Sequence, residues 1–192
     1  MLLRPGELLV VFAIGAAGGL VGDAGHVQAG TTEYLDDSLP FVWESALWFP
    51  LMVGLATASL AQIRLRLAPP RPGFDLRAGA GGIASVIGMY ALTAVLYEEP
   101  ELPVTVLIAT LAALVAAWLA DGRPALVCGL VAAIGGPVVE IAVVGADLAR
   151  YNEAADSLLG VAPWLVPLYF AFGVVAARLG ELAVARRSAV AA

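Results

Sequence analysis

The sequence predicts an all-α integral membrane protein, a six-transmembrane-helix bundle that forms a single domain. Of its 192 residues, 61% are hydrophobic and only 14% are charged, whereas about 25% are charged in soluble domains. The mean hydropathy is +0.91. Since a bilayer core about 30 Å thick needs about 20 apolar residues per helix, the chain has room for six crossings. The expected helices cover residues 6–28, 42–63, 77–97, 102–120, 124–147 and 157–184.

Each helix is expected from an apolar run. The first run, from Leu8 to Gly22, must continue past Asp23 to cross the bilayer. Uncharged runs over residues 45–63 and 78–97 supply the second and third helices, and residues 102–120 supply the fourth. Residues 124–146, interrupted only by Glu140, and residues 157–177 supply the last two. These lengths let the backbone groups form hydrogen bonds within their own helix, as a lipid environment requires.

Arginine placement predicts the orientation, because the chain contains no lysine and its basic residues fall mostly between alternate helices. Cytoplasmic loops of membrane proteins carry an excess of basic residues. One face collects Arg4, Arg64, Arg66, Arg71, Arg77, Arg123, Arg178, Arg186 and Arg187. The other collects Arg150 and the acidic residues Glu33, Asp36, Asp37, Glu44, Glu98, Glu99, Glu101, Asp147, Glu153 and Asp156. We therefore expect both termini in the cytoplasm, and the net charge of -6 argues against nucleic acid binding.

The N-terminus has a second interpretation as a cleaved signal peptide. Arg4, the apolar run after it and Val27-Gln28-Ala29 resemble the three parts of such a peptide. Cleavage would leave five crossings and place the termini on opposite faces. We expect the segment to be retained as the first helix.

Few residues here could support catalysis or bind a metal. With one histidine and one cysteine the chain has no zinc cluster, and it contains no glycine-rich phosphate loop or nucleophile elbow. We therefore expect no metal and no cofactor, and we do not expect an enzyme. Cys128 is expected to be a small core residue of the fifth helix.

Two polar residues stand near the end of the first helix. His26 follows Asp23 by three residues, so a helix would place both on one face. The simpler interpretation is an interfacial pair that water reaches. The alternative is a contact with a lipid headgroup or a proton relay, because polar side chains at membrane depth are often functional.

Glu140 is the most informative residue of the sequence. An acidic side chain at mid-bilayer costs about 2.5 to 3.5 kcal/mol, so it should face an internal cavity, find a donor or stay protonated. It follows Gly135-Gly136-Pro137, where a proline removes a backbone hydrogen bond and glycines leave space. The segment predicts a kink beside a pocket, although a kink without a ligand is the alternative.

Other prolines, glycines and aromatic residues have structural interpretations. Pro50 in the second helix and Pro163 and Pro167 in the sixth predict two more bent helices. Glycines four apart in the first helix, and Gly81, Gly82 and Ser85 in the third, could pack against a second copy in a homo-oligomer. Most aromatic residues near helix ends are expected to be interfacial anchors. They are Trp43, Trp48, Tyr97, Trp118, Tyr151 and Trp164.

Three segments resemble the Insig family. Ser45-Ala46-Leu47-Trp48-Phe49-Pro50 is similar to a Ser-Ala-Trp-Trp-x-Pro segment at the start of the family's second helix. Residues 118–121 look like its Trp-x-x-Asp motif. Trp164-Leu165, with Phe170, Gly173, Val174 and Gly180, looks like its last helix. The similarity extends over essentially the whole chain.

The resemblance implies a six-helix membrane protein with cytoplasmic termini. Animal Insig proteins bind oxysterols, hold the sterol-sensing protein Scap and escort a sterol-synthesis reductase to degradation. Asp121 matches an aspartate that the family needs for partner binding, but Gly122 replaces the arginine that follows it, so a hairpin-capping role is the safer expectation. Glu140 lies near a family glutamine. Because abundant alanine, glycine and arginine without lysine suggest a bacterial genome, we expect a bacterial homologue in the inner membrane rather than the animal circuit.

Three functions follow. The first is binding or sensing of one membrane lipid, either a sterol-like molecule or a two-chain glycerolipid such as diacylglycerol, in an intramembrane cavity. Its expected contacts are Glu140, Pro137, Trp48, Pro50, Tyr90 and His26, with Asp121 left to contact a membrane-protein partner. The second is a small membrane enzyme or proton-coupled carrier that uses Glu140 and Asp23. The third is a structural scaffold.

Overall fold

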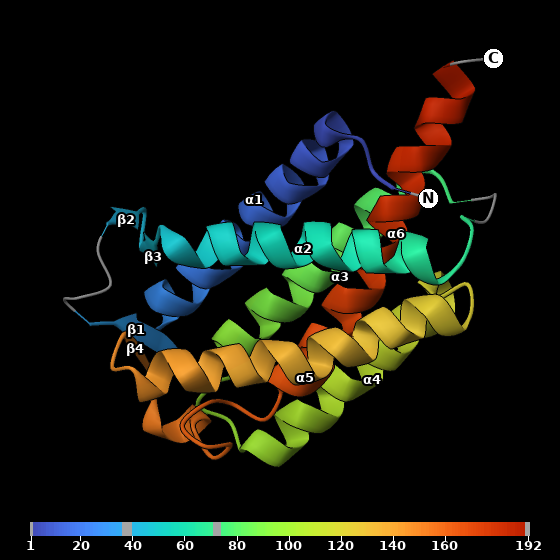
Figure 1. The fold of residues 1–192 in the computed structure, drawn as a ribbon. Coiled ribbons are helices and arrows are strands. Elements are labelled where there is room, and N and C mark those ends of the chain that lie inside the picture. The colour runs from blue at the N-terminus through green and yellow to red at the C-terminus, as the bar shows by residue number, and fades with distance from the viewer. Residues whose placement is uncertain (1, 36–39, 71–73, 191–192) are drawn as a thin grey trace.

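The computed structural model describes residues 2–35, 40–70 and 74–190, so the predicted loop charges Asp36, Asp37 and Arg71 lie outside the described residues. Six helices dominate it (Figure 1). They are α1 (Pro5–Ala29), α2 (Trp48–Leu67), α3 (Leu76–Val95), α4 (Glu101–Leu119), α5 (Arg123–Gly145) and α6 (Leu165–Val190). All six are long and apolar enough to span a bilayer. The predicted fold class is confirmed.

Two small antiparallel ribbons lie at one end of the bundle, opposite the start of α1 and the end of α6 (Figure 1). Strand β1 (Thr32–Tyr34) pairs with β4 (Ala149–Tyr151), and β2 (Phe41–Val42) pairs with β3 (Ser45–Ala46). A short 3-10 helix, η2 (Glu153–Ala155), follows β4. The β1–β4 ribbon connects the end of α1 to the end of α5, which are far apart in the sequence, whereas β2–β3 is a local hairpin before α2.

Two helices begin later than the sequence indicated, because turns occupy the expected first residues. Residues 42–47 belong to the β2–β3 hairpin, which turns at Trp43 with a φ of 53°. Residues 157–164 contain a turn in which Leu158 pairs with Val161 around Leu159 and Gly160, both with positive φ. Apolar composition alone could not separate these turns from helix.

Because these two helices begin later, their prolines do not lie in the helix interior. Pro50 is the third residue of α2, Pro167 is the third residue of α6, and Pro163 precedes α6. A proline in the first turn of a helix removes no helical hydrogen bond, since those N–H groups have no acceptor within the helix. Within the described helices only Pro137 occupies an interior position. The expectation that α2 and α6 are bent at these prolines is wrong.

Helix α6 is the centre of the bundle and contacts every other helix. Its first two turns bury Leu165, Leu168 and Ala171 almost completely. Trp164, just before it, is 0% exposed, and Tyr151 is also buried. These two aromatic residues are core residues and not interfacial anchors, whereas Trp43, which is 71% exposed, remains available for that role.

Two of the glycines of α1 that lie four residues apart pack against α2. A Cβ atom at Gly15 would overlap Thr57 of α2, and one at Gly19 would overlap Val53. In α3, a Cβ atom at Gly81 would overlap Trp118. These small residues therefore let neighbouring helices of one protomer approach closely, which is the usual effect of such spacing. Gly18 has no neighbour at its Cβ position, so a contact of Gly18 or Ser85 with a second copy stays a prediction.

Candidate functional site

Glu140 faces the interior of the bundle. Its side chain is only 7% exposed. Tyr169 of α6 donates its hydroxyl to Glu140 Oε1 at 2.7 Å, and Tyr151 of β4 donates to Oε2 at 3.4 Å. Donors from two other elements thus hold the carboxylate away from the acyl chains.

The glycine and proline before Glu140 shape this part of α5. A Cβ atom at Gly136 would overlap the ring of Tyr169, so glycine is what allows the tyrosine to lie against α5 and reach Glu140. Pro137 is buried inside the helix and cannot donate a backbone hydrogen bond. The local sequence therefore positions both the carboxylate and its principal donor.

Glu140 lines a small polar chamber at the ribbon end of the bundle. Its other polar walls come from several elements and include Asp23, His26, Thr32, Tyr34, Trp48, Tyr90 and Tyr151. The chamber volume is about 10 Å³, which is close to the space that one water molecule needs. Two carboxylates and three phenols thus surround one very small space.

Asp23 and His26 have separate partners inside the bundle. Tyr34 donates to Asp23 Oδ2 at 2.6 Å. His26 Nε2 lies 2.9 Å from Thr93 Oγ1 and 3.2 Å from the carbonyl oxygen of Tyr90. A carbonyl oxygen can only accept, so the contact with Tyr90 favours the tautomer with its proton on Nε2. His26 is 1% exposed and Asp23 is also buried, so the interpretation of a water-exposed interfacial pair is wrong.

The two strand tyrosines remain protonated donors to these carboxylates. Burial, followed by the charge of Asp23, raises the pKa of Tyr34. Burial, followed by the charge of Glu140, likewise raises the pKa of Tyr151 well above its ordinary value. Both hydroxyls therefore keep their protons, and ribbon β1–β4 supplies a donor to each acid.

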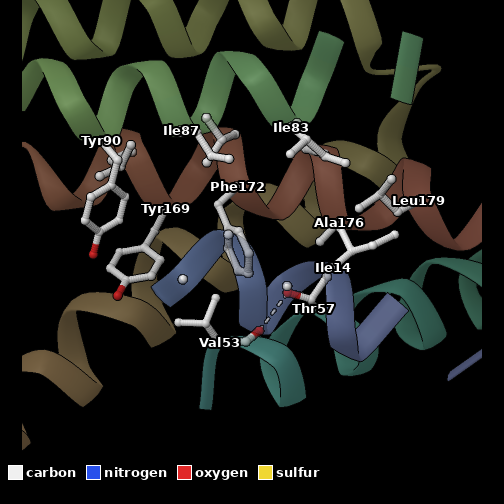
Figure 2. A pocket seen from close by; sticks show the side chains of 16 residues that line it. Ile14, Val53, Thr57, Ile83, Ile87, Tyr90, Tyr169, Phe172, Ala176 and Leu179 are labelled. Carbon is white, nitrogen blue, oxygen red and sulfur yellow. Dashed lines mark hydrogen bonds between the residues drawn. The ribbon is translucent and has the colours of Figure 1, made fainter. Parts of the chain in front are cut away.

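An apolar hollow begins beside this polar region and extends between α1, α2, α3 and α6. Figure 2 shows the hydroxyl groups of Tyr90 and Tyr169 at one end of it, with Ile83 and Leu179 toward the other. Its volume is about 70 Å³. The hollow therefore has a polar end and an apolar body, as an amphiphile does.

A second, larger hollow is a lateral groove between α2, α5 and α6. Its volume is about 400 Å³, and Glu140 forms part of its lining. Val53, Tyr169 and Phe172 line both hollows and therefore form the wall between them. Along the described parts of the chain, no arginine lines the chamber, the hollow or the groove.

The structure brings together four of the six residues expected at a lipid site: Glu140, Trp48, Tyr90 and His26 all line the chamber. Pro50 and Pro137 are buried in α2 and α5 but line none of the three spaces. The sequence reasoning missed other lining residues. They are Tyr34, Tyr151, Tyr169 and Phe172. The sequence contained one signal for Tyr169, which carries a hydroxyl group within an otherwise apolar span.

Asp121 lies at the opposite end of the bundle, in the α4–α5 hairpin. Its Oδ2 is 2.5 Å from Nη1 of Arg178 and 3.4 Å from Nη2 of Arg64. Gly122 is the residue that precedes α5, and no side chain caps the helix there. The expected hairpin-capping role is therefore wrong. Asp121, 15% exposed, holds the hairpin against α2 and α6 by ion pairs.

The ion pairs of Asp121 belong to a buried cluster. Glu181 of α6 forms ion pairs with both Arg64 and Arg178, and all three side chains are almost fully buried. The guanidinium of Arg178 also lies 4.4 Å from the centre of the Phe74 ring. Two of the arginines that were counted as loop charges thus connect helices within the bundle.

Comparison with known proteins identifies the family. No family model matches the chain. The INSIG protein homolog of Mycolicibacterium vanbaalenii is 53% identical over 187 residues, which are 97% of this chain and 91% of that protein. The chain belongs to the Insig family. The resemblance seen in the three sequence segments is confirmed.

Solved structures agree with this assignment. The crystal structure of the mycobacterial Insig homolog MvINS from Mycobacterium vanbaalenii matches with a TM-score of 0.94 at 53% identity, covering 97% of this chain and 98% of that one. A structure of a cross-linked MvINS trimer also matches with a TM-score of 0.94, at 52% identity and the same coverage. The six-helix arrangement is thus that of an Insig homologue.

Proposed function

We propose that this Insig-family protein binds and senses one membrane lipid with a small, uncharged hydroxyl headgroup. The observation that carries the proposal is the position of Glu140, a buried carboxylate at the junction of a polar chamber and an apolar groove. Either a sterol-like molecule or a two-chain glycerolipid such as diacylglycerol has the required chemistry. Trp48, Tyr90 and His26 would surround the polar end of the ligand.

The charges around Glu140 favour a neutral donor headgroup. A carboxylate offers about four acceptor positions, and the two tyrosines use two of them. A ligand hydroxyl could donate to another. A phosphate would meet Asp23 and Glu140 without a lining arginine to offset its charge, and an unpaired buried charge is costly.

The shape of the apolar space favours a ligand with two chains. The inner hollow and the lateral groove lie on the two sides of the wall formed by Val53, Tyr169 and Phe172. The lateral groove can take one acyl chain of a diacylglycerol, and the inner hollow, about 70 Å³ in volume, can take the first methylene groups of the second, while the free hydroxyl stays near Glu140. A sterol would fill the groove alone, which makes this the second ligand to test.

The proposal also covers the membrane, the orientation and the assembly of the protein. We infer a bacterial inner-membrane protein whose arginine-bearing face, with both termini, is cytoplasmic, following the positive-inside rule. A homo-oligomer is supported by the cross-linked trimer of the relative. A membrane-protein partner would contact the α4–α5 hairpin that Asp121 holds in place.

The test is to identify the lipid that remains bound after gentle extraction. Mass spectrometry of the purified protein should find one neutral hydroxyl lipid strongly enriched over the membrane extract. Glu140→Leu and Trp48→Ala should reduce that enrichment. Glu99→Gln, which changes an exposed carboxylate, is the matched control and should retain it. An unselective lipid mixture in all four proteins would contradict the proposal and leave a scaffold.

A small enzyme or proton-coupled carrier is a second candidate, because Asp23, His26 and Glu140 line one chamber. Each of these side chains already has a hydrogen-bond partner within the protein, which favours a binding role. Reconstituted protein should therefore leave an added diacylglycerol chemically unchanged. Turnover that disappears in Glu140→Gln would favour the enzyme instead.

A further inference from the structure

A third apolar space, a groove on the outer surface between α1 and α2, lies beside the proposed lipid site. It is lined by Leu8, Leu55, Ala58, Ser59, Gln62, Ile63 and Arg66, and its volume is about 320 Å³. It neighbours the lateral groove, with which it shares Leu55, Ser59 and Ile63. Unlike the three spaces near Glu140, it includes a cationic side chain, and like the inner hollow it has no carboxylate in its lining.

The length of this α1–α2 groove matches one leaflet. Arg66 follows Leu55 by eleven residues along α2, a distance of about 16 Å at about 1.5 Å per residue. Half of the bilayer hydrocarbon core is about 15 Å. With Arg66 in the last turn of α2, Leu55 lies near the bilayer midplane. An acyl chain in the groove would therefore keep its headgroup beside Arg66.

Arg66 is exposed and has no carboxylate partner among the described residues and, unlike the other exposed arginines of this end, it lines an apolar groove. Arg64 and Arg178 pair with Glu181, and Arg187 pairs with Glu7. For Arg66 there is no ion pair with any residue within the described ranges 2–35, 40–70 and 74–190. Its guanidinium can therefore contact an anion from outside the protein.

A second arginine lies close to the same end of the groove. The backbone N–H of Leu3 donates to Gln62 Oε1 at 3.0 Å, which fixes the N-terminal segment against α2. Arg4 follows and is exposed. Glu7, the nearby acid, is occupied by Arg187. The groove end thus carries two cations and no uncommitted carboxylate from these elements.

We propose that the α1–α2 groove binds an anionic phospholipid of the leaflet on the arginine-bearing side. One acyl chain lies along Leu8 and Ala58, which line this groove and not the lateral groove, and the phosphate group contacts Arg66, with Arg4 adding positive charge. This ligand has the opposite headgroup requirement to the lipid proposed beside Glu140. The two sites would allow one protein to bind a neutral and an anionic lipid at the same time.

The experiment measures lipid retention by the full-length protein in detergent, using native mass spectrometry with equal amounts of phosphatidylglycerol and phosphatidylcholine. Wild type should retain phosphatidylglycerol in preference. Arg66→Gln should lower that preference about fivefold, because one arginine contributes about 1 kcal/mol near an anionic surface. Arg123→Gln removes an exposed arginine of the same end that does not line the groove, and should retain the preference.

Further arms separate the headgroup from the chains and this groove from the Glu140 site. Glycerol phosphate, which lacks chains, should not bind at the same concentrations, and Glu140→Leu should leave phosphatidylglycerol retention unchanged. Equal retention of both phospholipids by wild type, or equal losses in Arg66→Gln and Arg123→Gln, would overturn the proposal. The proposal is also overturned if wild type retains neither lipid and its oligomer dissociates only in Arg66→Gln, because a second copy of the chain would then occupy the groove.

Discussion

Removing the hydroxyl group of Tyr169 tests how Glu140 is held. In Tyr169→Phe the carboxylate loses its 2.7 Å donor and keeps only the longer 3.4 Å bond from Tyr151. Hydrogen bonds between helices in membranes contribute about 0.6 kcal/mol on average and about 1.7 at most, whereas bonds to charged groups contribute about 1.5 to 3. The Tyr169 bond is short and its acceptor is a buried carboxylate, so its contribution should lie where these two ranges meet. We therefore expect Tyr169→Phe to lower the free energy of unfolding by about 1.5 kcal/mol.

The assay is reversible unfolding in bicelles by titration with sodium dodecyl sulfate, with helix content as the readout. Tyr151→Phe should lose only about 0.5 kcal/mol, because its bond is long. Tyr97→Phe removes a hydroxyl that donates to Glu98 at an exposed site and should change the free energy of unfolding very little. The order of the three variants checks the geometry directly.

A double-mutant cycle makes the test specific to the pair. In a Glu140→Leu background, Tyr169→Phe should have almost no further effect, which would give a coupling free energy of about 1 kcal/mol or more. The reasoning is refuted if Tyr169→Phe costs the same with and without Glu140. That result would mean that the tyrosine stabilises the bundle by packing and that its hydroxyl does not hold the acid.

Three other substitutions have expected outcomes. Gly136→Ala should displace the Tyr169 ring and so reduce retention of the neutral lipid. Retention by Gly136→Ala equal to that of wild type would contradict this. Glu181→Leu should lose about 3 to 5 kcal/mol in the same unfolding assay, because it leaves buried arginines without their partner. Trp164→Ala should lose about 3 to 5 kcal/mol as a buried core residue, whereas Trp43→Ala should lose less than about 1. Comparable losses for the two tryptophans would contradict the assignment of Trp164 to the core.

The sequence was informative where a single physical requirement dominates. The need for about 20 apolar residues per crossing indicated six helices, and the cost of a carboxylate in lipid indicated that Glu140 faces inward. Both follow from the bilayer as a solvent and need no knowledge of the tertiary contacts. The buried Glu140 and the six apolar helices agree with this reasoning.

The errors arose where tertiary partners decide the outcome. Trp164 lies near a helix end, as an anchor would, but α6 is the central helix and buries it. Asp121 and the arginines that pair with it come from three separate elements, so no local pattern marks them. His26 and Asp23 share a helix face but find partners on α3 and β1. Spacing along one helix shows which residues are neighbours and not what each one contacts.

The central claim is that Glu140 accepts a hydrogen bond from the hydroxyl of a bound lipid. Its most direct test is native mass spectrometry of the lipid-stripped protein with a diacylglycerol and with the same molecule methylated at its free hydroxyl. Wild type should bind the diacylglycerol with a clear preference, and Glu140→Leu should remove the difference between the two. Equal binding of both molecules by wild type would contradict the claim, since Glu140 would then have no part in recognising the headgroup.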